Sequence, residues 1–448
     1  MGSSAGTEIE TGRAADRICA AFRRRGHASL FLDGSGGFAE AWGPFLAVEP
    51  KVRLSHRASR PEESREALVS LDRIVEKRRR KQGGSPATGI AALAGYDLLD
   101  RAPVPSRDDD GLPDLVLLEV DTSILFVPGG RPVLTVLEEG SPGTGRDAVR
   151  RKLDEIPDIP DPPQRFSPCG SLATSLDRSR YLEAVEKVKR HIRLGDIYQA
   201  NLTQRFSATT THDPFDVYRA LVKATPAPRS AFVETDTFAL ASASPEVFLK
   251  AHPDGGIETR PIKGTRPRGS TAEEDDRATR ELLASEKDRA ELTMIVDLER
   301  NDLGRVCRTG SIGVPELCTL RSFAAVHHLV ARVEGRLNPD TSPSELIRAT
   351  FPGGSITGAP KIRAMEILRS LEPVRRGFYT GSLFWFGDDG SIDSSILIRS
   401  LVMTGGRVLI GAGGGVVADS DPEAEWRESN DKARALLGVF GLAPEEAV

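Results

Sequence analysis

Two stretches of the chain carry pairs of acidic residues one helical turn apart. Asp288 and Glu291 form the first pair, and Glu425 and Glu428 form the second. Residues three positions apart share a helix face, so each pair would project its carboxylates together. Four carboxylates converging from two helices would make an all-oxygen site, which suits Mg2+ better than Zn2+. The alternative is that both pairs lie on solvated helix faces.

Glycine clusters at 351–361 and 410–416 flank these segments. Glycine lets backbone N–H groups approach an anion closely, and Pro360 at a helix start would aim the helix N-terminus at the same place. The clusters therefore predict an acidic ligand, with tight turns between packed elements as the alternative. Gly358 is followed by Ala359 rather than Lys, so the first cluster fails the pattern of a nucleotide-binding P-loop.

Three single side chains could do acid–base or nucleophilic chemistry. Lys263 lies at a predicted strand end before Gly264, where partial desolvation would suit it to act as a nucleophile or base. Glu246 follows a predicted strand in an apolar setting, where burial would raise its pKa toward that of a general acid. The alternatives are a solvated surface lysine and a structural carboxylate. His328 lies in an apolar run, where a hydrogen-bonded core histidine is the alternative.

The composition is that of an ordinary globular enzyme. The 448 residues are 39% hydrophobic and 28% charged, which is enough for a sizeable core. Formal charge is -5, so no basic field for nucleic acid is expected. The 4 cysteines form no Cys-x-x-Cys pair, which indicates reduced thiols and a cytoplasmic location. No stretch reaches the roughly 18 apolar residues of a membrane span, so no membrane association is expected.

The elements that must position these residues are a mixture of helices and strands. Apolar spacing predicts helices near 63–81, 181–192, 271–306, 342–350, 360–370 and 421–440. Alternation predicts strands that include 28–32, 115–120, 197–206, 239–244, 381–386 and 395–402. The two kinds of element do not alternate regularly enough for a doubly wound sheet. Closely spaced prolines and glycines predict a connector between 138 and 175.

Six segments together resemble one family, the chorismate-utilising enzymes that include anthranilate, aminodeoxychorismate, isochorismate and salicylate synthases. The segments are Gly195–Leu202, Pro261–Thr265, Ile295–Asp302, His327–Val330, Gly354–Lys361 and Gly411–Val417. The resemblance extends over about 176–440, in order and at family-like spacing. It implies an α+β fold in which two packed antiparallel β-sheets are flanked by helices, with the site between the sheets and the acidic helices.

The resemblance also implies roles for single residues. Glu291 and Glu428 match the family's Mg2+ ligands, and Asp288 and Glu425 match the acidic residues that support them. Glu246 matches the general acid that protonates the departing 4-hydroxyl of chorismate. The other matches surround the substrate: Ser355, Tyr379, Arg399, Gly413, Gly414, Gly415, Lys432 and His328.

Two positions discriminate within the family. Isochorismate and salicylate synthases have a water-activating lysine where this chain has Gln199, so the resemblance implies ammonia as the nucleophile. Anthranilate synthases have alanine where this chain has Lys263, and the lysine form is typical of aminodeoxychorismate synthases. The expected reaction is attack of Lys263 on C2 of chorismate while Glu246 protonates the 4-hydroxyl. Ammonia then adds at C4 and expels the lysine. The product, 4-amino-4-deoxychorismate, leads to 4-aminobenzoate and folate. Anthranilate synthase component I and a catalytically silent homologue are the alternatives.

Domain organisation and partners complete the expectations. We divide the chain into a polar tail (1–13), an N-terminal region (14–137), the connector (138–175) and a chorismate-binding catalytic region (176–442). No stretch has the pattern of a glutamine amidotransferase, with its cysteine nucleophile in a glycine-rich turn. We therefore expect ammonia to come from a separate glutaminase subunit or from free ammonia.

Overall fold

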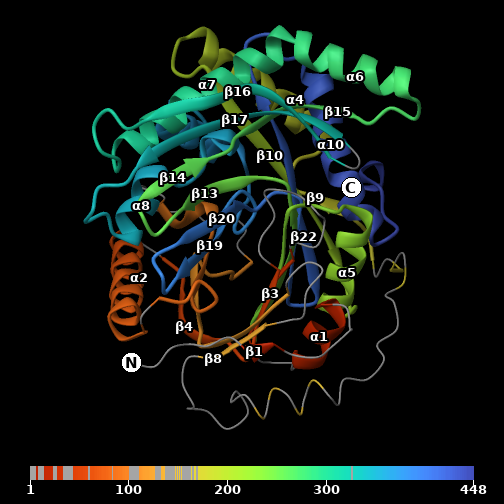
Figure 1. The fold of residues 1–448 in the computed structure, drawn as a ribbon. Coiled ribbons are helices and arrows are strands. Elements are labelled where there is room, and N and C mark those ends of the chain that lie inside the picture. Colours follow the sequence, from red (N-terminus) through yellow and green to blue (C-terminus); the bar gives the residue numbers. More distant parts are fainter. Residues whose placement is uncertain are drawn as a thin grey trace.

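The structure is a computed structural model. It describes residues 7–8, 15–23, 28–33, 44–58, 61–82, 84–99, 110–126, 133–136, 170–323 and 326–447, with a few single positions between 147 and 167. Its fold is α+β, as predicted, with two antiparallel sheets and helices outside them (Figure 1). Most of the predicted polar tail and most of the predicted connector lie outside the described residues, although Thr7–Glu8 of the tail form a short strand.

The first sheet contains 12 strands within the described part of the chain. Its order is β1 (Thr7–Glu8), β8 (Val133–Val136), β7 (Thr122–Leu125), β3 (Phe45–Ala47), β2 (Ser29–Asp33), β11 (Arg229–Glu234), β12 (Phe238–Ser244), β21 (Ser400–Thr404), β22 (Arg407–Val416), β10 (Gln199–Thr209) and β18 (Gly358–Ala359), and β9 (Ala173–Thr174) also pairs with β10.

The second sheet contains 10 strands in the same described ranges. Its order is β15 (Ile262–Pro267), β17 (Val326–Arg336), β14 (Gly256–Thr259), β13 (Val247–Ala251), β20 (Ile392–Ile396), β19 (Ser382–Gly387), β5 (Gly89–Ala94), β6 (Leu115–Val120) and β4 (Lys51–His56), and β16 (Gly313–Ser322) also pairs with β17.

Helices cover the outer faces of the sheets. They are α1 (Ala15–Phe22), α2 (Pro61–Gln82), α4 (Arg178–Arg193), α5 (Pro214–Ala224), α6 (Ala272–Ala284), α7 (Glu286–Gly304), α8 (Pro343–Thr350), α9 (Lys361–Leu371) and α10 (Pro422–Gly438), with short 3-10 turns η1 (Tyr96–Leu99), η2 (Gly354–Ile356) and η3 (Pro444–Glu446). The helix predicted over 271–306 is two helices, because Ser285 leaves helical geometry and caps α7 with its side chain.

Alternation along the strands divides the apolar residues between two layers. In β12, Ala239 and Ala241 face the core shared with α1, α5 and α10, whereas Phe238 and Leu240 face the second sheet. The layer between the sheets joins side chains of both, including Leu93 of β5. The period-2 pattern therefore builds a sandwich core, with separate cores under the outer helices.

The strand predicted over 395–402 is wrong as a single element. The chain leaves the second sheet at Ile396 and enters the first sheet at Ser400, and Arg399 between them has a positive φ of 52°. The reverse passage occurs nearby, where β12 ends at Ser244 and β13 begins at Val247. An apolar run across such a junction has the same appearance in sequence as one strand, because both halves are buried.

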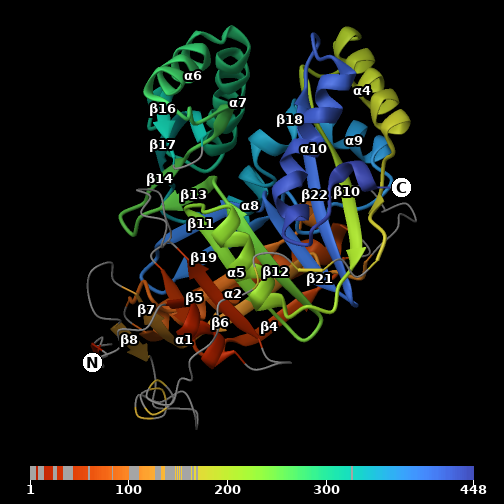
Figure 2. The same ribbon diagram turned by 90° about the vertical axis from the view of Figure 1, so that its right-hand side faces the viewer.

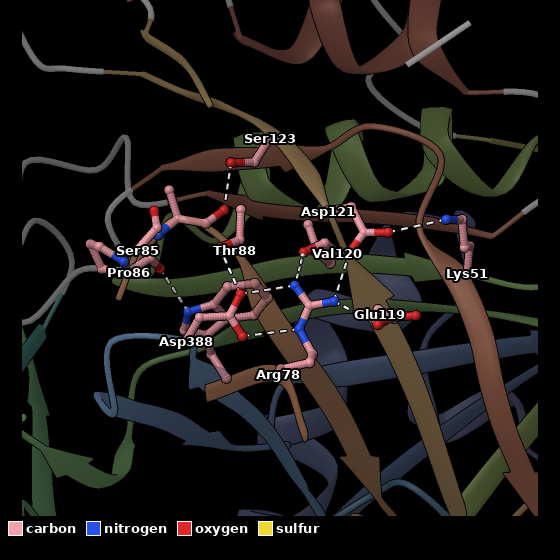
Figure 3. A network of polar contacts seen from close by, with 12 residues as sticks. Lys51, Arg78, Ser85, Pro86, Thr88, Glu119, Val120, Asp121, Ser123 and Asp388 are labelled. Carbon is pink, nitrogen blue, oxygen red and sulfur yellow. Dashed lines mark hydrogen bonds and ion pairs between the residues drawn. The ribbon is translucent and has the colours of Figure 1, made fainter. Parts of the chain in front are cut away.

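A buried arginine fastens α2 to the second sheet. The side chain of Arg78 is 4% exposed. Its guanidinium donates to both carboxylate oxygens of Asp388, at 2.9 and 2.8 Å. It also donates to Glu119, Asp121 and the carbonyl of Val120 (Figure 3). The helix predicted near 63–81 is thus attached to β6 and to the turn between β19 and β20.

None of the helices in the described part of the chain has both the length and the apolar character of a membrane span.

Candidate active site

A cleft of about 760 Å³ lies where the two sheets diverge. Residues of β15 and α7 line one side, and residues of β22 and α10 line the other. Figure 2 shows α6 and α7 standing opposite α4 and α10 at this end of the molecule. All of the predicted site residues except Gly414 and Glu425 line this cleft: Glu246, Lys263, Asp288, Glu291, His328, Ser355, Tyr379, Arg399, Gly413, Gly415, Glu428 and Lys432.

Lys263 enters the cleft from β15. The ladder between β15 and β17 shifts register after Lys263, where Gly264 has a φ of +72°. A Cβ at Gly415 would lie 3.5 Å from Lys263 Nζ and 2.1 Å from Gln199 Nε2. The amine and the discriminating glutamine therefore meet over a bare stretch of β22 backbone, which only glycine permits.

Glu246 lies at the crossing between β12 and β13. It is 3% exposed, and its Oε1 accepts a hydrogen bond from Ser355 Oγ at 2.7 Å. Burial raises the pKa of Glu246 to about 7, although Ser355 and the charge of Lys263 act to lower it. A carboxylic acid that keeps its proton near neutral pH beside a lysine is suited to general-acid catalysis.

His328 is 9% exposed and lies on β17 beside the same lysine-bearing strand. Its Nδ1 is 2.9 Å from Thr265 Oγ1. Burial lowers the pKa of His328 to about 4, so its imidazole is neutral at neutral pH. Its neighbour His327 faces away from the cleft, bonding to Ser322 and Asp275, and has the structural role that an apolar run favours.

Tyr379 and Arg399 supply the wall opposite α7. A Cβ at Gly411 would lie 2.2 Å from Tyr379 Cγ, so the ring rests directly on the β22 backbone. Burial raises the pKa of Tyr379 to about 12, which keeps its hydroxyl a hydrogen-bond donor. Arg399 lies between β20 and β21, where the chain passes from the second sheet to the first. Burial lowers the pKa of Arg399, and the charge interaction with Tyr379 opposes that change. The pair offers an O–H donor and a cation to an acidic ligand.

The predicted acidic pair of α10, Glu425 and Glu428, faces the glycines of β22. Glu425 is 3% exposed, and its Oε1 accepts from Ser420 Oγ at 2.6 Å, whereas its buried Oε2 has no hydrogen-bond partner among the described residues. A Cβ at Gly414 would lie 3.2 Å from this Oε2 and 3.4 Å from Glu428 Oε1. Lys432 Nζ donates to Glu428 at 2.7 Å and to the carbonyl of Gly413 at 3.0 Å.

The acidic pair of α7 lies across the cleft. Lys287 Nζ is 3.9 Å from Glu291 Oε1, and Arg266 donates to Asp288 at 3.2 Å. Burial raises the pKa of Glu291, against the opposite effect of Lys263 and Lys287. Burial also acts to raise the pKa of Glu428, but Lys432 and the other cleft lysines outweigh it and lower that pKa.

The carboxylates provide the oxygen donors that Mg2+ prefers, but in this structure they lie too far apart to hold one ion together. Among the described residues, no three His, Cys, Asp or Glu side chains stand close enough to hold a metal ion. The donors are nevertheless all oxygen, and the unpartnered Oε2 of Glu425 is a buried acceptor that a cation would satisfy. Lysines now neutralise Glu291 and Glu428, so an ion would take the place of those contacts.

Sequence reasoning missed several cations of the cleft. Arg266, Lys287 and Arg427 line it beside the acidic residues. Lys287 lies four residues before Glu291 on α7, so helical spacing could have assigned it to the same face. Arg266 had no comparable signal, because only the pairing of β15 with α7 brings it to Asp288.

The comparisons identify the class of protein that this fold and cleft define. The sequence pattern of the family described as "chorismate binding enzyme" matches residues 28–438. The chain therefore belongs to the chorismate-binding enzymes.

The individual relatives of this chain include two kinds of synthase component. Over 371 residues the chain is 43% identical to "Aminodeoxychorismate synthase component 1" of Bacillus subtilis (strain 168), covering 82% of this chain and 78% of the relative. It is 40% identical to "Anthranilate synthase component 1" of Thermus thermophilus over 367 residues, covering 79% and 78%. The crystal structure of anthranilate synthase component I from Streptococcus pneumoniae TIGR4 matches with a TM-score of 0.75 and 28% identity, covering 88% of this chain and 91% of that one.

Proposed function

We propose that this chain is component 1 of an aminodeoxychorismate synthase and converts chorismate and ammonia to 4-amino-4-deoxychorismate. The observation that carries the proposal is the meeting of Lys263 with Glu246 in one cleft, where the charge of Lys263 acts on the carboxyl group of Glu246. A nucleophile and a proton donor at one site allow the 4-hydroxyl to leave while a new bond forms at C2. The relative from B. subtilis, named as such a synthase, supports the same assignment.

The proposed reaction has two substitutions with shift of a double bond. In the first, Lys263 Nζ forms a bond to C2, the ring double bond shifts, and the C4–O bond breaks as Glu246 delivers its proton and water leaves. In the second, ammonia forms a bond to C4, the double bond shifts back, and the C2–N bond to Lys263 breaks. Ammonia has then replaced the hydroxyl at C4, and the enolpyruvyl group is retained.

The ionic groups of chorismate would be held by the charged walls. Tyr379, Arg399 and the bare backbone of Gly413 and Gly415 offer donors to a carboxylate. Glu291 and Glu428 would hold Mg2+, with Asp288 and Glu425 supporting them, and that ion would bind the other carboxylate and neutralise its charge. Fixing two charged groups sets the ring's position relative to Lys263 and Glu246.

Ammonia would come from a glutamine amidotransferase subunit or from free ammonia. The relatives' name, component 1, implies a multi-subunit synthase. In the described part of this chain Cys19 and Cys307 are buried, and burial raises the pKa of Cys307 to about 11. A thiol of that kind is a poor glutaminase nucleophile, because thiolate formation is required.

A second candidate is anthranilate synthase component 1. The T. thermophilus relative of that name is 40% identical, close to the 43% of the first relative. The position of Lys263 in the cleft argues against it, because direct attack of ammonia at C2 needs no lysine there.

Product identification tests the proposal. The purified chain is incubated with chorismate, Mg2+ and a high ammonium concentration at alkaline pH. The products are separated by chromatography and identified by mass spectrometry. We expect 4-amino-4-deoxychorismate, which an added lyase converts to 4-aminobenzoate. Anthranilate formed without added lyase would instead place the chain with the anthranilate synthases.

A further inference from the structure

Arg376 is a buried cation just behind the wall of the cleft. It does not line the cleft, and its side chain is 2% exposed. It belongs to the segment between α9 and β19 that also carries Tyr379. A fully buried guanidinium must have its donors satisfied, so each of its contacts fixes a neighbouring segment.

The guanidinium of Arg376 bonds to three segments of the cleft wall. Its Nη2 donates to the carbonyl of Asn201 at 2.6 Å. Its Nη1 donates to the carbonyl of Ile356 at 3.0 Å and to Thr380 Oγ1 at 3.3 Å. Asn201 and Ile356 line the cleft themselves, and Thr380 follows Tyr379.

The direction of the guanidinium is set by a paired carboxylate. Arg376 Nε and Nη2 donate to the two oxygens of Glu372 at 2.9 and 2.7 Å. Glu372 Oε1 also accepts from the backbone N–H and the hydroxyl of Thr203, at 3.0 and 2.9 Å. The guanidinium carbon lies 4.2 Å from the centre of the Tyr96 ring, which comes from the N-terminal region. Planar, two-point pairing leaves the remaining donors little freedom of orientation.

Ile356 connects this arrangement to the catalytic acid. The preceding residue, Ser355, donates to Glu246 Oε1 at 2.7 Å. A shift of the η2 turn would therefore move the hydrogen bond that orients the carboxyl group. One guanidinium thus governs the turn beside Glu246, the start of β10 and the loop that carries Tyr379.

We propose that Arg376 is a positioning residue that sets the substrate-facing wall of the cleft through Asn201, Ile356 and Thr380. The inference rests on the proposed function only in taking chorismate as the ligand. A lysine at this position would keep the charge but could not reach the four partners at once, because its donors spread from a single nitrogen.

The test compares Arg376→Lys with Arg375→Lys. Arg375 is the adjacent buried arginine, and it pairs with Asp114 at 2.5 Å and with Asp97 at 3.7 Å, both in the N-terminal region rather than in the cleft wall. Chorismate Kd by calorimetry, and kcat and KM with ammonium, are measured for wild type and both variants, with Tm as the measure of stability. For Arg376→Lys we expect chorismate Kd and KM to rise about 10-fold or more. Arg375→Lys should lower Tm while leaving the Kd within about twofold.

Equal loss of stability in the two variants, with chorismate Kd, KM and kcat unchanged for Arg376→Lys, would overturn the inference and leave Arg376 a purely structural residue.

If Arg376→Lys does not fold, Thr203→Val decides, because it removes only the hydroxyl group that donates a hydrogen bond to Glu372. We expect its Kd to rise roughly 3- to 10-fold, and an unchanged Kd would overturn the inference. Binding of chorismate without amination in wild type would contradict only the proposed function, since the Kd comparison needs no product.

Discussion

At the scale of single residues, the cleft combines groups with opposite demands on their protons. Glu246 must carry a proton to act as an acid, and Lys263 must be free of one to act as a nucleophile. The two side chains differ in environment: Glu246 is 3% exposed and burial raises its pKa to about 7, whereas Lys263 is only partly buried. This difference is the basis of two predictions.

Replacing Lys263 tests the covalent route. For Lys263→Ala we expect formation of 4-amino-4-deoxychorismate to fall roughly 100-fold or more, a barrier increase of about 2.7 kcal/mol. The matched control is Lys250→Ala, since Lys250 lies on β13 of the same sheet outside the cleft. Stopped-time assays with product separation measure both, and some anthranilate-like product from Lys263→Ala is expected. Wild-type kinetics in Lys263→Ala would remove the covalent step from the mechanism.

The raised pKa of Glu246 predicts a pH-dependent stability. Its pKa is about 7 in the folded state, against an ordinary value of 4.5 for glutamate, so the folded state holds this proton more tightly than the unfolded chain does. The stabilisation is fully present below pH 4.5 and is lost as pH rises through 7. Between pH 4.5 and 8, the free energy of unfolding of wild type should fall relative to Glu246→Gln by about 3 kcal/mol.

Denaturant unfolding of wild type and Glu246→Gln at matched pH values measures this difference. Subtracting the two curves removes the contribution of other titrating groups, including buried Glu299, whose pKa burial also raises. A difference that stays constant with pH would mean that Glu246 does not hold its proton above its ordinary range.

At the scale of elements, the cleft depends on bare backbone in β22. Tyr379 occupies the space that a side chain on Gly411 would need, with a clash distance of 2.2 Å. The atoms that an added Cβ would meet are Cγ, Cδ1 and Cδ2 of the Tyr379 ring, so the ring itself would have to move. Gly411 therefore serves packing, in addition to the anion binding that we propose for Gly413 and Gly415.

We expect Gly411→Ala to displace the Tyr379 ring and raise chorismate Kd roughly 10-fold or more. The control is Gly438→Ala at the end of α10, where no neighbouring atom of the described part of the chain lies within 4 Å of the added Cβ. Alanine there should be neutral or stabilising by up to about 1 kcal/mol. Titration of chorismate into each variant gives the two Kd values, and equal affinity for Gly411→Ala would show that Tyr379 does not depend on that glycine.

Helices α7 and α10 together predict a magnesium effect. Mg2+ should raise Tm by binding the folded state only, and Glu428→Gln or Glu291→Gln should remove that rise. Glu286→Gln is the control, because Glu286 is exposed in the first turn of α7. Differential scanning fluorimetry across Mg2+ concentrations, with EDTA as the metal-free reference, measures the shift. A rise retained in Glu428→Gln would place the ion elsewhere.

At the scale of the whole molecule, the N-terminal region is built into both sheets. Strand β2 pairs with β11 in the first sheet, and β5 pairs with β19 in the second. Residues of β2 and β5 also share the core between the sheets. The region boundaries at 137 and 175 stay a prediction. The strand pairings indicate that the N-terminal region and the catalytic region fold together.

A truncation tests this dependence. Residues 138–448 alone would expose the edges of β11 and β19 and the apolar layer that β2 and β5 cover, so we expect no cooperative folding. Co-expression with residues 1–137 should restore a folded complex. Circular dichroism and size-exclusion chromatography distinguish the cases, and cooperative unfolding of the fragment by itself would show that the C-terminal region is independent.

The sequence by itself determined the local elements and the types of group in the site. Helix α10 is evident from its spacing, and the face shared by Glu425 and Glu428 follows from 3.6-residue periodicity. These properties depend on residues within a few positions of one another. The same is true of α2 and of β6, whose predicted ranges agree with the structure to within two residues.

Only the tertiary structure decided how the elements meet. At Glu246 and at Arg399 the chain passes from one sheet to the other, and the strands on either side pair with distant parts of the chain. Gly411 contacts Tyr379, and Arg376 bonds to Asn201 and Ile356, across similarly long separations in sequence. No local periodicity records such pairings, since apolar runs read the same whether they continue in one sheet or pass to another. The place of Arg399 between the two sheets and the partners of Arg376 therefore became visible only in the assembled structure.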